Sequence, residues 1–351
     1  MSLTLIYPRL EDETANLRLD RLLSNVLQGI SLHTLRRAEE LSGLSGKRLL
    51  FAVPVGQFGV NTEYQRMLMK LRSCPHLLDG CMAGLVVDGS GELYTKSTAA
   101  ELTLAANLAG CSFIGRPLVE ATGSLVNFQV QASLLHTDLE GAYLASAREL
   151  VERLLVFTPT KKDRPELLVL HASTRHVSNS MDLWEQVKAR ISDHCDITEI
   201  GLRNGTLSDC SGCPYTMCLH FGEKGGCFYG GVMQDEVYPA VRRSDAILMV
   251  CPNYNDALSA NLTAFINRLT ALFRQTRFYN KALFSIVVSG YSGGDIVSRQ
   301  LVSALNMNKS FWLPQNFALI ETANDPGVAL SLPNIEDRLD GFAQNILNTL
   351  I

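Results

Sequence analysis

Short apolar runs alternate with longer amphipathic stretches along the second half of the chain. Five runs have the length and composition of buried parallel strands, at residues 166–171, 196–202, 245–251, 282–289 and 317–321. Apolar residues recur at helical spacing over residues 181–194, 258–273, 294–305 and 335–350. Because strands that alternate with helices form an open parallel sheet covered on both faces, this pattern predicts a five-stranded α/β domain.

The first half of the chain has a less regular pattern. Strand-like runs occupy residues 48–53, 84–88 and 112–120. Helical patterns occupy residues 17–30, 32–41, 63–71, 97–108 and 142–155. These elements predict a smaller, irregular α/β domain, with no residue-level repeat of the second half.

A polar stretch at residues 158–165 separates the two patterns. It contains two prolines and no apolar periodicity, as is typical of a linker. We therefore expect two domains, residues 1–160 and residues 161–351.

Composition and charge exclude several classes of protein. With 351 residues, of which 46% are hydrophobic and 19% charged, the chain can bury a core and is not disordered. The net charge of −4 argues against nucleic acid as a partner, and no uncharged apolar run approaches the ~20 residues that span a membrane. The N-terminus turns acidic early and lacks a basic signal region, so we expect a cytoplasmic protein with reduced cysteines.

The loop after the first strand of the second half is rich in short polar side chains. It carries Ser173, Arg175, Ser178, Asn179 and Ser180 between a strand and a helix N-terminus. A phosphate at this position would meet free backbone N–H groups, and the arginine would add charge-assisted hydrogen bonds. An ordinary capped turn explains the same residues. Glycine-rich nucleotide motifs are absent from the chain, so a nucleotide triphosphatase is not supported.

Two further strand ends carry residues suited to a flat ligand. They supply small polar groups, glycines and tyrosine rings, namely Pro252, Asn253, Tyr254 and Asn255 after the third strand and Ser289, Gly290, Tyr291 and Gly293 after the fourth. Ser292 lies in a G-x-S-x-G pattern typical of hydrolases. No histidine follows His220, so that serine lacks the downstream base a hydrolase needs.

Four of the nine cysteines are clustered after the second strand. Cys210, Cys213, Cys218 and Cys227 lie within eighteen positions, in a glycine-containing segment. Thiolates at such spacing bind iron–sulfur clusters or zinc, and clustered free thiols are the third explanation. The other five cysteines have the pattern of small core or near-surface residues.

Two motifs in the second half resemble a known family. The first is Ala172-Ser173-Thr174-Arg175 followed by Ser178-Asn179-Ser180, and the second is Pro252-Asn253-Tyr254 followed by the segment 259–268. Over about residues 166–325 the chain resembles the NADPH-dependent FMN reductase and iron–sulfur flavoprotein group of the flavodoxin-like superfamily. Ala172, Thr263 and Asn267 stand where that group has Gly, Lys and Asp.

The resemblance implies a cofactor, an activity and partners. FMN would place its phosphate in the 173–180 loop and its ring between residues 252–255 and 289–294. The protein would then be an enzyme that takes hydride from NAD(P)H and reduces a small-molecule acceptor such as a quinone or a flavin, with no catalytic side chain required. The four cysteines lie where iron–sulfur flavoproteins carry a compact ligand motif, although two intervals here are longer.

Several alternatives stay open at this stage. The chain could instead be an FMN and iron–sulfur electron-transfer protein without NAD(P)H turnover. The first domain could be a degenerate flavodoxin-like unit, and it could cover the flavin or act as an independent module. A homo-oligomer is compatible with the resemblance, and neither the acceptor nor the choice between NADH and NADPH follows from the sequence.

Overall fold

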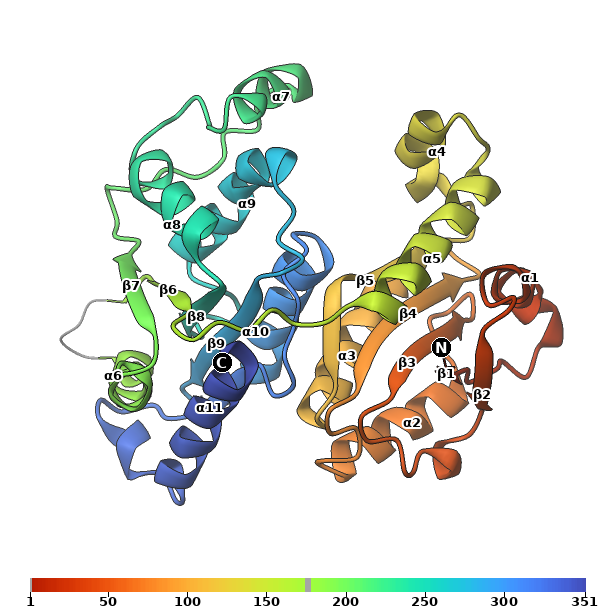
Figure 1. The fold of residues 1–351 in the computed structure, drawn as a ribbon, viewed down its shortest axis with the longest axis horizontal. Coiled ribbons are helices and arrows are strands. Elements are labelled where there is room, and N and C mark those ends of the chain that lie inside the picture. The colour runs from red at the N-terminus through yellow and green to blue at the C-terminus, as the bar shows by residue number, and fades with distance from the viewer. Residues whose placement is uncertain (1, 174–177) are drawn as a thin grey trace. The chain divides into compact units, whose positions relative to one another are not determined.

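The computed structural model describes residues 2–173 and 178–351. The chain divides into two compact units, Met1–Thr158 and Pro159–Ile351, which we call the N-terminal and C-terminal units. Each unit contains one five-stranded sheet, and every strand pair in both sheets is parallel (Figure 1). None of the described helices is long and apolar enough to span a membrane.

The C-terminal unit has the five strands that the sequence predicts, with ends that differ by at most one residue. They are β6 (Glu166–His171), β7 (Asp196–Gly201), β8 (Ala246–Pro252), β9 (Ala282–Ser289) and β10 (Ala318–Thr322). The sheet order is β10-β9-β8-β6-β7. If the five strands are numbered 1 to 5 along the chain, the order across the sheet, read from β7, is 2-1-3-4-5. This is the strand order of flavodoxin-like folds. The predicted fold class of this unit is therefore confirmed.

The helices of the C-terminal unit connect these strands. They are α6 (Asn179–Ile191), α7 (Tyr215–Glu223), α8 (Tyr238–Arg243), α9 (Ala260–Gln275), α10 (Gly294–Leu301) and α11 (Ile335–Leu350), with short π-helical or 3-10 turns at η4 (Met233–Val237), η5 (Val302–Met307) and η6 (Val328–Ser331). The serine before α6 and the serine before α9 each cap their helix by accepting a backbone N–H. Trp184 of α6 and Phe265 of α9 are fully buried, so both helices face the core.

The N-terminal unit is more complete than its sequence pattern indicates. Its strands are β1 (Ser2–Ile6), β2 (Ser31–Leu35), β3 (Arg48–Val55), β4 (Met82–Gly89) and β5 (Ser112–Ala121). Their order is β2-β1-β3-β4-β5, the same topology as in the C-terminal unit. The helix predicted at residues 32–41 is wrong, because that segment forms β2 and the 3-10 turn η2 (Ala38–Glu40). Most side chains of β2 are exposed at the sheet edge, so no apolar run marked it as a strand.

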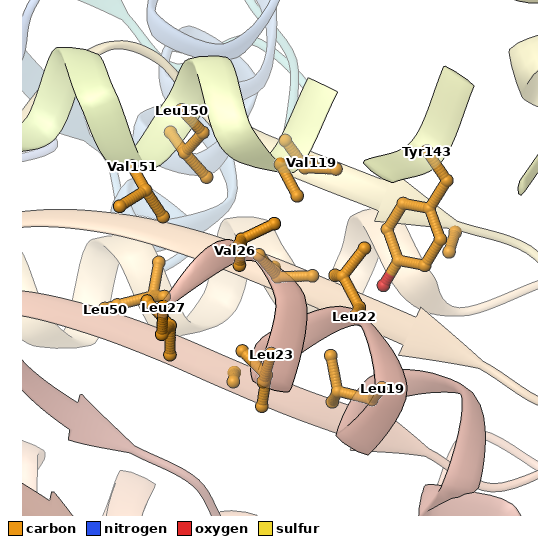
Figure 2. Close-up of a cluster of buried hydrophobic side chains, with 14 of the residues drawn as sticks. Leu19, Leu22, Leu23, Val26, Leu27, Leu50, Val119, Tyr143, Leu150 and Val151 are labelled. Atoms are coloured by element: carbon orange, nitrogen blue, oxygen red, sulfur yellow. The ribbon is translucent and has the colours of Figure 1, made fainter. Parts of the chain in front are cut away.

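Helices and a shared core complete the N-terminal unit. The helical elements are η1 (Glu13–Asn16), α1 (Leu17–Val26), α2 (Thr62–Ser73), α3 (Thr95–Leu108), η3 (Val126–Phe128), α4 (Gln129–Leu135) and α5 (Leu139–Val156). The hydrophobic cluster in Figure 2 combines Leu22 and Val26 of α1 with Leu150 of α5 and the sheet residue Leu50. Each such side chain contributes roughly 1.5–3 kcal/mol by leaving water. This unit therefore has a hydrophobic core of its own.

Candidate functional site

The candidate site of the C-terminal unit lies at the carboxyl edge of its sheet. Because all five strands are parallel, the loops after β6, β8, β9 and β10 emerge at the same edge. The order of the strands reverses between β6 and β8, and ligands of open α/β sheets bind at this point. The predicted site residues lie on the loops around it.

The loop after β6 contributes buried hydroxyl groups. Ser173 is buried, and its Oγ has no hydrogen-bond partner among the described residues. Ser178 caps α6 through the backbone N–H of Met181, and its Oγ lies 3.0 Å from Oγ of the buried Ser180. Arg175 lies outside the described residues. The described part of this loop thus combines a capped helix N-terminus with one buried hydroxyl that no other described residue binds.

Asn179 connects the start of α6 to the loop after β10. Its Nδ2 donates to the carbonyls of Ala323 (3.0 Å) and Asp325 (2.9 Å), and its Oδ1 accepts from the backbone N–H of Ala329 (3.3 Å). All the polar atoms of the carboxamide are therefore engaged within the protein. The side chain of Asn179 positions the site, and these bonds leave it little capacity to contact a ligand directly.

Asn253 joins the ends of β8 and β9. Its Nδ2 donates to Ser289 Oγ (3.1 Å) and to the carbonyl of Ser292 (2.9 Å), and its backbone N–H donates to the carbonyl of Val288 (2.8 Å). Its Oδ1 is buried and has no partner among the described residues. A buried carbonyl oxygen without a partner suits the N–H group of a bound ligand.

A tight turn follows Asn253 and presents an aromatic ring. Tyr254 and Ala257 exchange both backbone hydrogen bonds, and the two residues between them have positive φ. This geometry matches a two-residue turn with both central residues left-handed. Tyr254 is 56% exposed and Tyr291, after β9, is 82% exposed. Both rings are therefore accessible beside the strand ends.

Two glycines allow the backbone to pack closely at this edge. Gly293 has φ +87°, and a Cβ there would lie 2.1 Å from Asp256 Oδ1. A Cβ at Gly290 would lie 2.9 Å from Asn324 Oδ1. Sequence reasoning did not select Asp256 or Asn324 as site residues. The Asn255-Asp256 pair, which starts three positions after the strand-ending Pro252, was the available signal for the first of them.

A buried polar network supports the loop after β6. His171 Nδ1 lies 3.3 Å from the carbonyl of Ser173, and its Nε2 lies 3.5 Å from Glu199 Oε1. Glu199 also accepts from Trp184 Nε1 at 3.1 Å. The network ties β6, β7 and α6 together beneath the loop, so His171 is a core residue with partners on both ring nitrogens.

The four clustered cysteines lie along α7 and the segments that flank it. Cys210 is exposed, while Cys213, Cys218 and Cys227 are half-buried. Within the part of the chain that the structure describes, no group of three or more His, Cys, Asp or Glu side chains is placed to hold a metal ion. This conformation does not present the four thiols as one ligand set.

The arrangement defines a flavodoxin-like α/β domain with a candidate ligand site at its strand reversal. Residues 165–325 match the family model of the NADPH-dependent FMN reductases, and this part of the chain is a domain of that family. The family that the sequence motifs suggested is therefore confirmed over this range.

Solved structures similar to this chain correspond to about half of it. Smu.1420 from Streptococcus mutans UA159 is 12% identical, with 52% of this chain and 99% of that chain covered and a TM-score of 0.39. The NAD(P)H:quinone oxidoreductase from Methanothermobacter marburgensis is 15% identical, with 53% and 96% covered and a TM-score of 0.40. The azoreductase from Bacillus anthracis str. Sterne is 13% identical, with 52% and 97% covered and a TM-score of 0.36. No curated protein matches the chain.

Proposed function

We propose that the C-terminal unit binds FMN and that the protein is an NAD(P)H-dependent oxidoreductase that reduces a small-molecule acceptor, such as a quinone or a flavin. The family match supports this proposal. The observation that carries it is the pair of buried atoms, Ser173 Oγ and Asn253 Oδ1, that have no partner among the described residues and lie at the strand ends where a ligand of this fold binds.

The residues at the site fit the two ends of FMN. On the phosphate side are the hydroxyls of Ser173 and Ser180 and the N-terminus of α6, and the sequence adds Arg175. On the ring side are residues 252–255 and 289–293, where Gly290 and Gly293 keep the backbone free of side chains. When bound, FMN supplies the redox chemistry, since it accepts a hydride and passes the electrons on.

The protein's own contribution is to bind and orient. Asn253 holds the β8 and β9 loops at a fixed separation through Ser289 and Ser292. The exposed rings of Tyr254 and Tyr291 leave the edge of the site open to solvent. An open edge lets a nicotinamide donor and a second acceptor use the same face in turn.

An FMN and iron–sulfur electron carrier is the second candidate function, because of the four cysteines. The described side chains do not fit a cluster, so no step is assigned to one. Iron and acid-labile sulfide in protein purified without oxygen would favour this candidate.

We propose that the N-terminal unit is itself a degenerate flavodoxin-like domain. Its strand order is the same as that of the C-terminal unit. Pro54 in β3 and Pro252 in β8 each precede a helix-capping residue by seven positions, Asn61 and Ser259 respectively. The loop after β1, however, carries Glu11 and Asp12 directly before Glu13 of η1, where a phosphate would have to bind. Like charges at that position disfavour FMN.

The proposed function is tested with FMN, riboflavin and reduced nicotinamide nucleotides. We expect the purified chain to show a flavin spectrum, to bind FMN at least about tenfold more tightly than riboflavin, and to turn over NADH or NADPH with a quinone. Equal affinities for FMN and riboflavin would contradict the phosphate placement. Flavin binding without any nicotinamide turnover would favour the electron carrier.

A further inference from the structure

A second hollow of the C-terminal unit lies away from the strand ends, between α7, α9 and the turn after η5. Its volume is about 1000 Å³. Its walls come from the cysteine segment on one side and from α9 and the segment 304–309 on the other. The lining residues of α9 lie between Ile266 and Arg274, beyond the first turn of the helix, whereas the candidate flavin site lies at the carboxyl ends of the strands.

The charge in this hollow has one sign. Arg274, Arg277 and Lys309 line it, and no Asp or Glu is among its lining residues. In the part of the chain that the structure describes, none of the three forms an ion pair with a carboxylate. Lys309 Nζ donates only to Thr270 Oγ1, at 2.8 Å. Three positive charges therefore meet in one concave region without an acidic partner to neutralise them.

Aromatic rings hold these cations without removing their charge. The guanidinium of Arg274 lies 4.6 Å from the ring centre of Tyr215. The guanidinium of Arg277 lies 4.3 Å from the ring centre of Phe273, and Lys309 Nζ lies 5.5 Å from the same ring. Cation–π contacts orient a positive group without using its N–H donors, and of the Arg277 donors Nη1 already donates to the carbonyl of Phe273.

One donor of the hollow is buried and unused. Nε of Arg274 is buried and has no hydrogen-bond partner among the described residues. Burial, together with the nearby Arg274, lowers the pKa of Lys309. The contribution of Arg274 to the lowered pKa of Lys309 shows that these two cations repel each other, so an anion bound between the positive side chains would be stabilised.

We propose that this hollow is a binding site for a small molecule that carries two or more linked phosphates, such as a nucleoside diphosphate. Three cations with several donors each match the several oxygens of linked phosphates better than they match a single carboxylate. The exposed ring of Tyr215 provides a stacking surface for a base. The site is independent of FMN, and the segment that carries the four cysteines forms one of its walls.

The test is a calorimetric titration of the full chain, saturated with FMN, with pyrophosphate and with ADP at low ionic strength. We expect one saturable site per chain for both ligands. Arg277→Gln and Lys309→Gln should each weaken binding at least about tenfold, because each removes a charge-assisted contact. Lys161→Gln, which removes one exposed charge from the linker, is the matched control and should bind like the wild type. Equal affinities for the two ligands would assign the site to the phosphates alone, and tighter binding of ADP would assign it to a nucleotide.

Three results would overturn the proposal: no saturable binding to the wild type, unchanged affinity in both the Arg277 and Lys309 variants, or release of FMN by ADP. The last result would assign the ligand to the flavin site. The absorbance of bound flavin in each variant provides the separate readout, because it reports folding of the C-terminal unit and occupancy of the flavin site. Absence of NAD(P)H turnover would contradict the proposed activity and leave this titration unaffected, since pyrophosphate binding does not require turnover.

Discussion

Ser173 and Asn253 each bury a polar atom that no described residue satisfies. Leaving such an atom without a partner costs about 1–3 kcal/mol, and a ligand that supplied the partner would recover that free energy. Most polar atoms near these two are already paired, as the carboxamide of Asn179 illustrates. The two free atoms are therefore the residues where ligand binding should be most sensitive to substitution.

We expect Ser173→Ala to separate ligand binding from folding. Loss of a hydrogen bond to a charged phosphate costs about 1.5–3 kcal/mol, so FMN affinity should fall by about tenfold to a hundredfold. The melting temperature of the FMN-free protein should stay the same or rise, because the substitution removes an unsatisfied hydroxyl. Flavin fluorescence titration and thermal melts measure the two effects.

Ser285→Ala is the matched control for this change. Ser285 is also buried, but its Oγ already donates to the carbonyl of Met249 at 3.0 Å. Its loss should lower stability by about 1 kcal/mol and leave FMN affinity unchanged. If Ser173→Ala behaved in the same way as this control, Ser173 would have no role in FMN binding.

Buried thiols make the stability of the C-terminal unit depend on pH. Burial raises the pKa of Cys251 from 9.0 to about 12 and that of Cys195 to about 11. Above pH 9 the unfolded chain releases these protons while the folded chain retains them. The free energy of unfolding should therefore fall as pH rises from 9 toward 11, by up to about 1.4 kcal/mol per pH unit for each thiol.

This dependence can be measured by tryptophan fluorescence, since Trp184 and Trp312 both belong to the C-terminal unit. Denaturant unfolding between pH 9 and 10 gives the slope before the buried tyrosines contribute strongly. Cys251→Ala should flatten the slope, and Cys210→Ala, at an exposed thiol, should not. An identical slope in the wild type and in Cys251→Ala would show that this thiol does not carry the effect.

At the scale of elements, α6 and the loop after β10 depend on one side chain. Asn179 makes three hydrogen bonds to that loop, two as donor and one as acceptor. We expect Asn179→Ala to destabilise the C-terminal unit by about 2–4 kcal/mol, because the carbonyls of Ala323 and Asp325 would lose their donor. Chemical denaturation measures the loss. Asn348→Ala, which removes an exposed amide contact with Gln344, should change stability by less than about 0.5 kcal/mol.

The elements that the sequence predicted well are those with a buried and regular pattern. β8 and β9 are continuous apolar runs, and α9 buries Leu262, Phe265 and Leu269 on one face. β2 lacked such a pattern, because an edge strand pairs through its backbone and exposes most of its side chains. Its leucines also recur at spacings that resemble a helix.

At the scale of the whole molecule, two units with the same strand order share one chain. Each has its own sheet, and the N-terminal unit has its own core. The C-terminal unit has the polar loop and the buried Ser173 and Asn253 atoms that we propose bind FMN, whereas Arg9, in the corresponding loop of the N-terminal unit, is already paired with Asp20. We therefore expect the two units to differ in ligand binding although they share one strand order.

We expect a fragment of residues 159–351 to fold and to bind FMN with the affinity of the full chain, because its sheet and site are complete within it. Residues 1–158 should fold separately and bind no FMN. Circular dichroism and flavin titration of both fragments check this. A 159–351 fragment that is insoluble or loses its flavin would instead indicate that the N-terminal unit covers the flavin.

The sequence by itself determined the five strands of the C-terminal unit, the family of residues 165–325 and the positions of Ser173 and Asn253 at strand ends. These features depend on local periodicity and short motifs, which are written in consecutive residues. Only the tertiary structure identified Asn179 as a connector to Asp325, 146 residues further along the chain. Only the tertiary structure showed that Arg274, Arg277 and Lys309 line one hollow. It also showed that the four cysteines, although close in sequence, are not placed together as a set of metal ligands. The physical reason is that contacts between distant segments follow from how helices pack on the sheet, and local periodicity does not specify that packing.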